Sequence, residues 1–313
     1  MKVAYLFPGQ GAQYVGMGKA LHDASPEARR CFETANQVLG FDLARLCFEG
    51  PERELTSTAN SQPAILTVSV AALRALEARG GVALEPVAAA GLSLGEYSAL
   101  VAAGALAFED AVRVVRRRGE LMEAASRQQP GTMCSVMGLA IEQVEAACRQ
   151  AGAEVANLNA PGQVVISGRK EAVVAAAEAA KQAGGKAIML DVSGAFHSSL
   201  MAPAAKGLDE VLAATAMQPT RYAVLANVDA QPHADPAQIR QRLVRQLTSP
   251  TLWEQSMRAL VQRGVTQYLE IGPGKVLRGL FRRIDAAATV TGIEAPEDLE
   301  RLGDQLREAY APR

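Results

Sequence analysis

Short apolar runs, separated by glycine-rich turns and longer amphipathic stretches, dominate the hydrophobic pattern of this chain. Four of these runs are typical of buried strands followed by helical sequence; they are Val3–Phe7, Pro86–Ala90, Ala223–Val228 and Gln267–Ile271. Strands that alternate with helices indicate an α/β core around a mostly parallel sheet. The pattern therefore predicts such a core for most of the chain.

A segment in the middle of the chain has a different order of predicted strands and helices. It predicts strand, helix, strand, strand, helix and strand, which is the ferredoxin-like order. These elements are Thr132–Met137, Ile141–Gln150, Glu154–Leu158, Gln163–Ser167, Glu171–Ala183 and Lys186–Val192. A turn at Pro161 and Gly162 supports the central hairpin. We expect a small subdomain at residues 127–192, inserted into a large domain of residues 1–126 and 193–313, with a ligand cleft between them.

Composition narrows the classes of function. The 313 residues carry 32 Lys+Arg against 33 Asp+Glu, a formal net charge of −1, which speaks against a strongly basic nucleic-acid binder. No stretch approaches the roughly 20 apolar residues of a membrane helix. The apolar run before Pro8 is too short for a signal peptide, so we expect none. The four cysteines lack CxxC or metal-like spacing. They indicate reduced thiols, so we expect a cytoplasmic protein without a metal site. Nothing in the sequence requires more than a monomer.

The most informative segment is Gly91–Tyr97, which reads GLSLGEY and follows a predicted strand. Its G-x-S-x-G pattern is typical of a sharp strand-to-helix turn that lifts a serine Oγ clear of the backbone. The N–H of Leu94, at the start of the helix, could donate to a developing oxyanion. The sequence thus predicts Ser93 as a nucleophile; the alternative is an ordinary glycine-rich turn.

A serine nucleophile needs a base, and the chain has three histidines. We expect His22 and His233 to be solvated surface residues. His197 follows the last strand of the predicted subdomain, where the chain returns to the large domain, and we predict it as the base rather than a structural loop histidine. A triad acid could only be a residue such as Asp191, and a dyad oriented by a carbonyl group is at least as well supported.

One arginine lies on the wrong face of a predicted helix at Asp110–Ala124. Apolar residues form one face of this helix, and Arg118 falls in its middle, four residues before Met122. Arginine is almost never buried without a partner. We interpret Arg118 as a guanidinium that binds a ligand carboxylate in a bidentate way. The alternative is a structural salt bridge to a distant residue such as Glu270.

Together these features resemble the malonyl-CoA:acyl carrier protein transacylase family almost end to end. Seven motifs carry the resemblance, in the family's order; they are Phe7–Gln13, Gly91–Tyr97, Arg118-Gly119, Asn159–Gly168, Gly194–Met201, Arg245–Leu247 before Trp253, and Glu270–Leu277. The resemblance implies an α/β-hydrolase-like core with an inserted ferredoxin-like subdomain. It implies transfer of a malonyl group from malonyl-CoA to the phosphopantetheine thiol of an acyl carrier protein, for fatty-acid or polyketide synthesis, without a cofactor.

The resemblance also implies catalytic roles. Ser93 matches the acylated nucleophile and His197 the general base. Gln10 and Leu94 match the positions whose backbone amides form the oxyanion hole. Gln246 matches a glutamine whose backbone carbonyl orients the imidazole.

Further residues are expected to contact the substrate. Arg118 matches the arginine that pairs with the malonyl carboxylate, and Phe196 would crowd an α-methyl branch. We add Asn159 from the matched hairpin motif and Met122 from the helix of Arg118. One departure is Leu92, where the family usually has histidine, which leaves His197 as the only plausible proton acceptor.

Two other functions stay open. A thioesterase or acyl hydrolase could use the same scaffold, although it would need no carboxylate-binding arginine. An inactive scaffold that binds a carrier protein is the second alternative. For an acidic carrier protein we expect a basic patch; its candidates are Lys275, Arg278, Arg282 and Arg283, which could equally be a solvated helix face.

Overall fold

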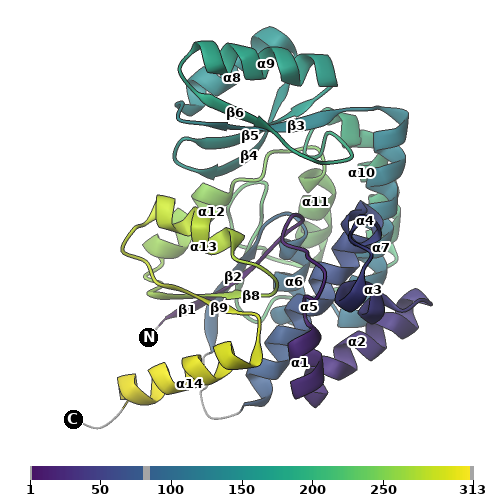
Figure 1. Cartoon of the computed structure of the whole chain (residues 1–313), viewed down its shortest axis with the longest axis vertical. Helices are drawn as coiled ribbons and strands as arrows, with labels where there is room; N and C mark the ends of the chain where they lie inside the picture. Colours follow the sequence, from purple (N-terminus) through teal and green to yellow (C-terminus); the bar gives the residue numbers. More distant parts are fainter. Residues whose placement is uncertain (1, 80–84, 311–313) are drawn as a thin grey trace.

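The computed structural model describes residues 2–79 and 85–310 of the chain. A five-stranded sheet lies at its centre, with neighbouring strands in the order β7-β2-β1-β8-β9 and every pair parallel (Figure 1). Its strands are β1 (Val3–Phe7), β2 (Pro86–Gly91), β7 (Ala223–Leu225), β8 (Gln267–Ile271) and β9 (Val290–Ile293). The parallel α/β core predicted from the sequence is confirmed.

Two strands differ from the sequence prediction. Strand β9 was not predicted, because it has only four residues, one of them glycine, at the edge of the sheet. The strand expected over Ala223–Val228 ends at Leu225, where the chain turns: the Ala226 N–H donates to the Gln231 carbonyl at 2.9 Å. This turn carries Asn227, whose side chain belongs to the candidate site described below.

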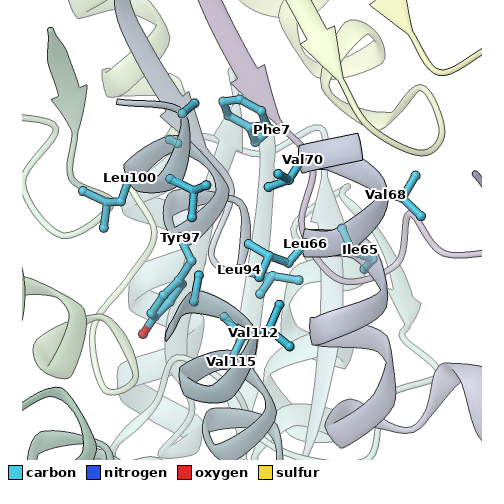
Figure 2. Packing of buried hydrophobic residues seen from close by; sticks show 14 of the residues in the cluster. Phe7, Ile65, Leu66, Val68, Val70, Leu94, Tyr97, Leu100, Val112 and Val115 are labelled. Atoms are coloured by element: carbon cyan, nitrogen blue, oxygen red, sulfur yellow. The ribbon is translucent and has the colours of Figure 1, made fainter. Parts of the chain in front are cut away.

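Alternate residues of β1 point to opposite faces of the sheet, and both faces are covered. Tyr5 and Phe7 belong to the larger hydrophobic core, and Figure 2 shows Phe7 with other buried side chains of this core. Ala4 and Leu6 belong to a second core on the other face. The larger core includes side chains of α5 (Thr58–Ala78), α6 (Gly95–Ala102) and α7 (Phe108–Gln128), and the second core includes side chains of α12 (Trp253–Gln262) and α13 (Val276–Ile284).

The other helices outside the second sheet range from three to 15 residues in length. They are α1 (Lys19–Ala24), α2 (Pro26–Leu39), α3 (Leu43–Glu49), α4 (Glu52–Thr56), the 3₁₀ turn η1 (Ser199–Met201), α10 (Ala202–Ala213), α11 (Pro236–Gln246) and α14 (Pro296–Tyr310). Among the described helices, none is long and apolar enough to cross a lipid bilayer.

A second, four-stranded antiparallel sheet forms from the middle of the chain, at the top of Figure 1. Its strands lie in the order β4-β5-β3-β6, and two helices and a separate apolar cluster cover one side. Its elements are β3 (Thr132–Met137), α8 (Ile141–Ala151), β4 (Glu154–Ala160), β5 (Gln163–Gly168), α9 (Lys170–Gln182) and β6 (Lys186–Met189). The predicted order of strands and helices is confirmed, although the last strand ends earlier than expected.

Strand β4 pairs with the loop that follows α11. The Thr251 N–H donates to the Ala156 carbonyl and the Leu158 N–H donates to the Thr251 carbonyl, each at 2.9 Å. Thr251 lies in the loop between α11 and α12. This pairing holds the hairpin that carries Asn159 against the segment that follows Gln246.

Candidate active site

Ser93 lies in a very tight turn between β2 and α6. Its φ of 52° is in the left-handed region, which non-glycine residues rarely adopt, and such strain is concentrated at functional sites. Glycine is required on both sides: a Cβ at Gly91 would lie 1.9 Å from the Gly95 carbonyl carbon, and one at Gly95 would lie 2.1 Å from the Phe7 carbonyl oxygen. The pattern of small residues therefore has a direct steric cause in this turn.

The imidazole of His197 contacts the serine. Its Nε2 lies 2.9 Å from the Ser93 Oγ, and its Nδ1 lies 2.9 Å from the backbone carbonyl of Gln246. A carbonyl oxygen only accepts, so the hydrogen sits on Nδ1 and Nε2 is free to accept the serine proton. Asp191 is exposed and the carbonyl occupies Nδ1, so Asp191 is not a triad acid. Among the described residues, no carboxylate contacts this imidazole.

Burial controls the protonation state of this base. His197 is 5% exposed, and burial, followed by the positive charge of Arg118, lowers the pKa of its imidazole to about 4. A neutral imidazole is therefore the stable form at pH 7. Because only the neutral form can accept a proton, this environment suits a general base.

Arg118 enters the same site from α7 and is 1% exposed. Its Nη1 donates to the Gln62 Oε1 at 2.8 Å, and its Nη2 donates to the Ser93 Oγ at 3.1 Å and to the Gln246 Oε1 at 2.9 Å. Among the described residues no carboxylate pairs with it, and its Nε has no partner. The alternative salt bridge to Glu270 is wrong, because Glu270 pairs with Arg278 at 2.8 Å.

The loop after β1 lies directly against the serine turn. The Leu92 N–H donates to the Phe7 carbonyl at 3.1 Å, and a Cβ at Gly9 would lie 2.2 Å from the Leu92 carbonyl oxygen. Within residues 2–79 and 85–310, the N–H groups of Gln10 and Leu94 make no hydrogen bond. These two unsatisfied donors lie in the loop after β1 and in the residue that follows Ser93.

The remaining predicted contacts surround this centre less directly. Phe196 is buried next to His197, and Met122 is buried behind Gln62, whose Nε2 donates to the Met122 Sδ at 3.2 Å. Asn159 is half-buried, and its Oδ1 has no partner among the described residues. The structure therefore links Met122 to Arg118 through one amide, while a substrate contact for Asn159 and Phe196 stays a prediction.

Sequence reasoning missed a group of polar residues under the serine turn. The Asn227 Oδ1 accepts the Ser93 N–H at 2.6 Å, and its Nδ2 donates to the Gly91 carbonyl at 2.7 Å. Glu96 is fully buried and accepts the Asn227 N–H at 2.9 Å. A charge within the apolar run after Ser93 is the same signal that singled out Arg118, so Glu96 could have been found in this way.

The expectation that His233 is a solvated surface residue is wrong. Its side chain is 0% exposed and its Nε2 lies 2.9 Å from the Glu96 Oε1. His22 retains 25% of its side-chain exposure beside Asp23. On α13, Arg278 also departs from the prediction of a free basic patch: it is half-buried against Glu270.

Comparison with known proteins identifies the family of this chain. A family model described as acyl transferase domain matches residues 4–289. A malonyl CoA-acyl carrier protein transacylase of Bacillus subtilis (strain 168) is 46% identical over 313 residues, covering 98% of each chain. One from Staphylococcus aureus (strain MRSA252) is 40% identical over 305 residues, covering 96% of this chain and 97% of the relative.

Solved structures give the same result. A malonyl-transacylase in complex with its type II PKS acyl-carrier protein superposes with a TM-score of 0.94 at 41% identity, covering 97% of this chain and 100% of that one. A malonyl CoA-acyl carrier protein transacylase from Clostridium perfringens also reaches 0.94, at 38% identity, covering 99% and 98%. The chain therefore belongs to the acyl transferase domain family, among the malonyl CoA-acyl carrier protein transacylases.

Proposed function

We propose that this protein transfers a malonyl group from malonyl-CoA to the phosphopantetheine thiol of an acyl carrier protein, through an ester on Ser93. The observation that carries this proposal is the double contact of the Ser93 Oγ. A neutral imidazole from His197 and a buried guanidinium from Arg118 both reach it, at 2.9 and 3.1 Å. One is suited to accept a proton and the other to bind a carboxylate.

In the first half-reaction the Ser93 hydroxyl gives its proton to the His197 Nε2 as its Oγ attacks the thioester carbonyl. The carbonyl oxygen becomes an oxyanion, which the free N–H groups of Gln10 and Leu94 stabilise. The intermediate collapses, the carbon–sulfur bond breaks, and the CoA thiolate takes the proton from the imidazolium. One such oxyanion donor contributes about 10²–10³ in rate.

In the second half-reaction the same groups act in reverse. His197 deprotonates the phosphopantetheine thiol, the sulfur attacks the Ser93 ester, and the serine regains its proton from the imidazolium. Every step moves only protons and an acyl group, so the reaction as written balances without a cofactor. A thioesterase, in which water takes the acyl group, has no use for a buried cation beside the serine.

Arg118 supplies selectivity for a malonyl group. Its Nη2 donates to the Ser93 Oγ and to the Gln246 Oε1, so one nitrogen of the guanidinium already lies next to the reacting oxygen. A carboxylate two bonds from the acyl carbon would take up this fork in a bidentate way. Phe196, buried beside His197, would crowd a branch at the α-carbon, which favours malonyl over methylmalonyl donors.

The carrier protein would approach over exposed cations of α13. Lys275, Arg282 and Arg283 are exposed there, whereas Arg278 is neutralised by Glu270. A cationic face suits an acidic carrier protein.

We place the reaction in the cytoplasm, which the four free cysteines support. There the protein would act as a monomer and supply extender units for fatty-acid or polyketide synthesis.

Peptide mapping tests the acyl-enzyme. The protein is mixed with malonyl-CoA, quenched in acid and digested. The proposal predicts a malonyl adduct on the peptide that contains Ser93, and none in Ser93→Ala. A stable malonyl adduct on Ser93→Ala would contradict it.

A further inference from the structure

A buried carboxylate lies directly beneath the serine turn, on the first turn of α6. Glu96 is 0% exposed, and all eight residues of this helix are buried. Its Oε2 accepts from the Asn227 N–H at 2.9 Å and from the Gln246 Nε2 at 2.8 Å. Its Oε1 contacts the His233 Nε2 at 2.9 Å. Both oxygens are thus engaged by donors that come from other segments of the chain.

Within the described part of the chain, the His233 side chain has one polar partner, which is Glu96. Because a carboxylate only accepts, the His233 Nε2 carries the hydrogen. Its Nδ1 is buried without a partner among the described residues. The bond to Glu96 therefore has no competing side-chain hydrogen bond that would favour another ring orientation. The backbone N–H of His233 donates to the Val224 carbonyl at 2.9 Å, which ties the residue to strand β7. His233 therefore holds Glu96 from a fixed position beside β7.

The carboxylate determines which way the Gln246 side-chain amide points. An acceptor-only group at Glu96 requires the amide nitrogen on its side, and the amide oxygen then faces Arg118. The observed contacts agree: the Gln246 Nε2 donates to Glu96 at 2.8 Å and to the Ser93 carbonyl at 3.0 Å, while its Oε1 accepts from the Arg118 Nη2 at 2.9 Å. The flipped amide would set an NH₂ group against the guanidinium, donor against donor.

Gln246 thereby links a buried anion to a buried cation that has no carboxylate partner of its own among the described residues. We propose that Glu96, oriented by His233, is a positioning residue that sets the Arg118 guanidinium for the acyl carboxylate through the Gln246 amide. This inference rests on the proposed malonyl transfer. It predicts that Glu96 and His233 affect the choice between malonyl and acetyl donors although neither touches the acyl group.

The choice of variants separates orientation from packing. Glu96→Ala removes both acceptor oxygens, so only the Ser93 carbonyl and the Arg118 guanidinium still orient the Gln246 amide. In Glu96→Gln an amide oxygen at the Oε2 position can keep the bonds from Asn227 and Gln246, and its NH₂ can donate to His233 in the other tautomer. His233→Ala removes the donor that holds Glu96. His233→Gln keeps a side-chain N–H that is long enough to donate to the same carboxylate.

The test measures kcat/KM for acyl-enzyme formation from malonyl-CoA and from acetyl-CoA in each variant. We expect the malonyl-to-acetyl ratio to fall about tenfold in Glu96→Ala, which removes the bond from Gln246 directly, and severalfold in His233→Ala, which removes only the donor that holds Glu96. Glu96→Gln and His233→Gln should keep the ratio within about threefold. Thermal unfolding, followed by the single, buried Trp253, reports folding separately.

Equal losses with both donors, or a Glu96→Gln ratio as low as that of Glu96→Ala, would overturn the inference. If Glu96→Ala does not fold, the His233→Ala and His233→Gln pair decides: an unchanged ratio in His233→Ala overturns it. Failure of the proposed function itself is distinct, because the wild-type protein would then form no malonyl adduct at all.

Discussion

Replacement of Arg118 by alanine should convert a malonyl-selective site into one that barely distinguishes malonyl from acetyl donors. The guanidinium is 1% exposed, so a carboxylate that binds it is desolvated as well. Truncation of one partner of such a buried pair costs about 2–5 kcal/mol, or roughly 30- to 4,000-fold in kcat/KM for malonyl-CoA.

An acetyl group has no carboxylate, so acetyl-CoA should lose far less. At the reacting atom, acetyl loading loses the 3.1 Å bond from the Arg118 Nη2 to the Ser93 Oγ. A hydrogen bond from a charged group contributes about 1.5 kcal/mol, which corresponds to roughly tenfold. Arg118→Lys should fall between wild type and Arg118→Ala, because an ammonium is a point charge that cannot form the planar fork.

Stopped-flow loading with each donor measures these ratios. Arg113→Ala is the matched control, since Arg113 lies on the exposed face of the same helix and pairs with Asp110 at 2.9 Å. It should load both donors at the wild-type rate. Equal losses of malonyl and acetyl loading in Arg118→Ala would refute the idea that this guanidinium binds the acyl carboxylate.

The buried base and the tight turn give further predictions. With a pKa of about 4 for His197, malonyl loading should be constant from pH 8 to 5 and fall only near pH 4; a break near 6.5 would contradict this. The pKa of His197 in the unfolded chain is about 6.5, so the unfolded state gains a proton first as the pH falls. The free energy of unfolding should therefore decrease by about 3 kcal/mol between pH 6.5 and pH 4. Urea unfolding of His197→Gln should lack this pH-dependent decrease. Gly95→Ala places a Cβ 2.1 Å from the Phe7 carbonyl oxygen and should slow loading about a hundredfold. Gly279→Ala, on α13 with open space around it, should instead raise the free energy of unfolding by about 0.5–1 kcal/mol with unchanged loading; similar losses in both glycine variants would disprove the steric argument.

Much of the fold was accessible from the sequence, because hydrophobic period and turn chemistry agree locally. Val3–Phe7 and Gln267–Ile271 are strands with the bounds that their apolar runs predict. Strand β9 was missed because an edge strand of four residues with a glycine carries almost no periodic signal. The strand predicted over Ala223–Val228 is too long for another reason. The residues on either side of Asn227 are apolar because they are buried in a turn, and Asn227 itself bonds to the serine turn.

The candidate site shows where local pattern stops being informative. Ser93 stands in a turn with its own sequence signature, and Arg118 breaks the apolar face of its helix, so both could be recognised in isolation. His233 could not, because its local sequence is that of a polar loop and its partner Glu96 lies 137 residues away. Long-range pairing of two buried polar groups leaves a trace only in the three-dimensional structure.

Intact-protein mass spectrometry, before and after addition of holo acyl carrier protein, tests the central claim most directly. The protein is first loaded with malonyl-CoA, and Ser93→Ala is treated in parallel. The account predicts a malonyl-sized adduct on the wild-type protein alone, which disappears on addition of the carrier as the carrier gains the same mass. An adduct lost to water at the same rate without the carrier would instead identify a hydrolase, and the absence of any adduct would leave only a carrier-binding scaffold.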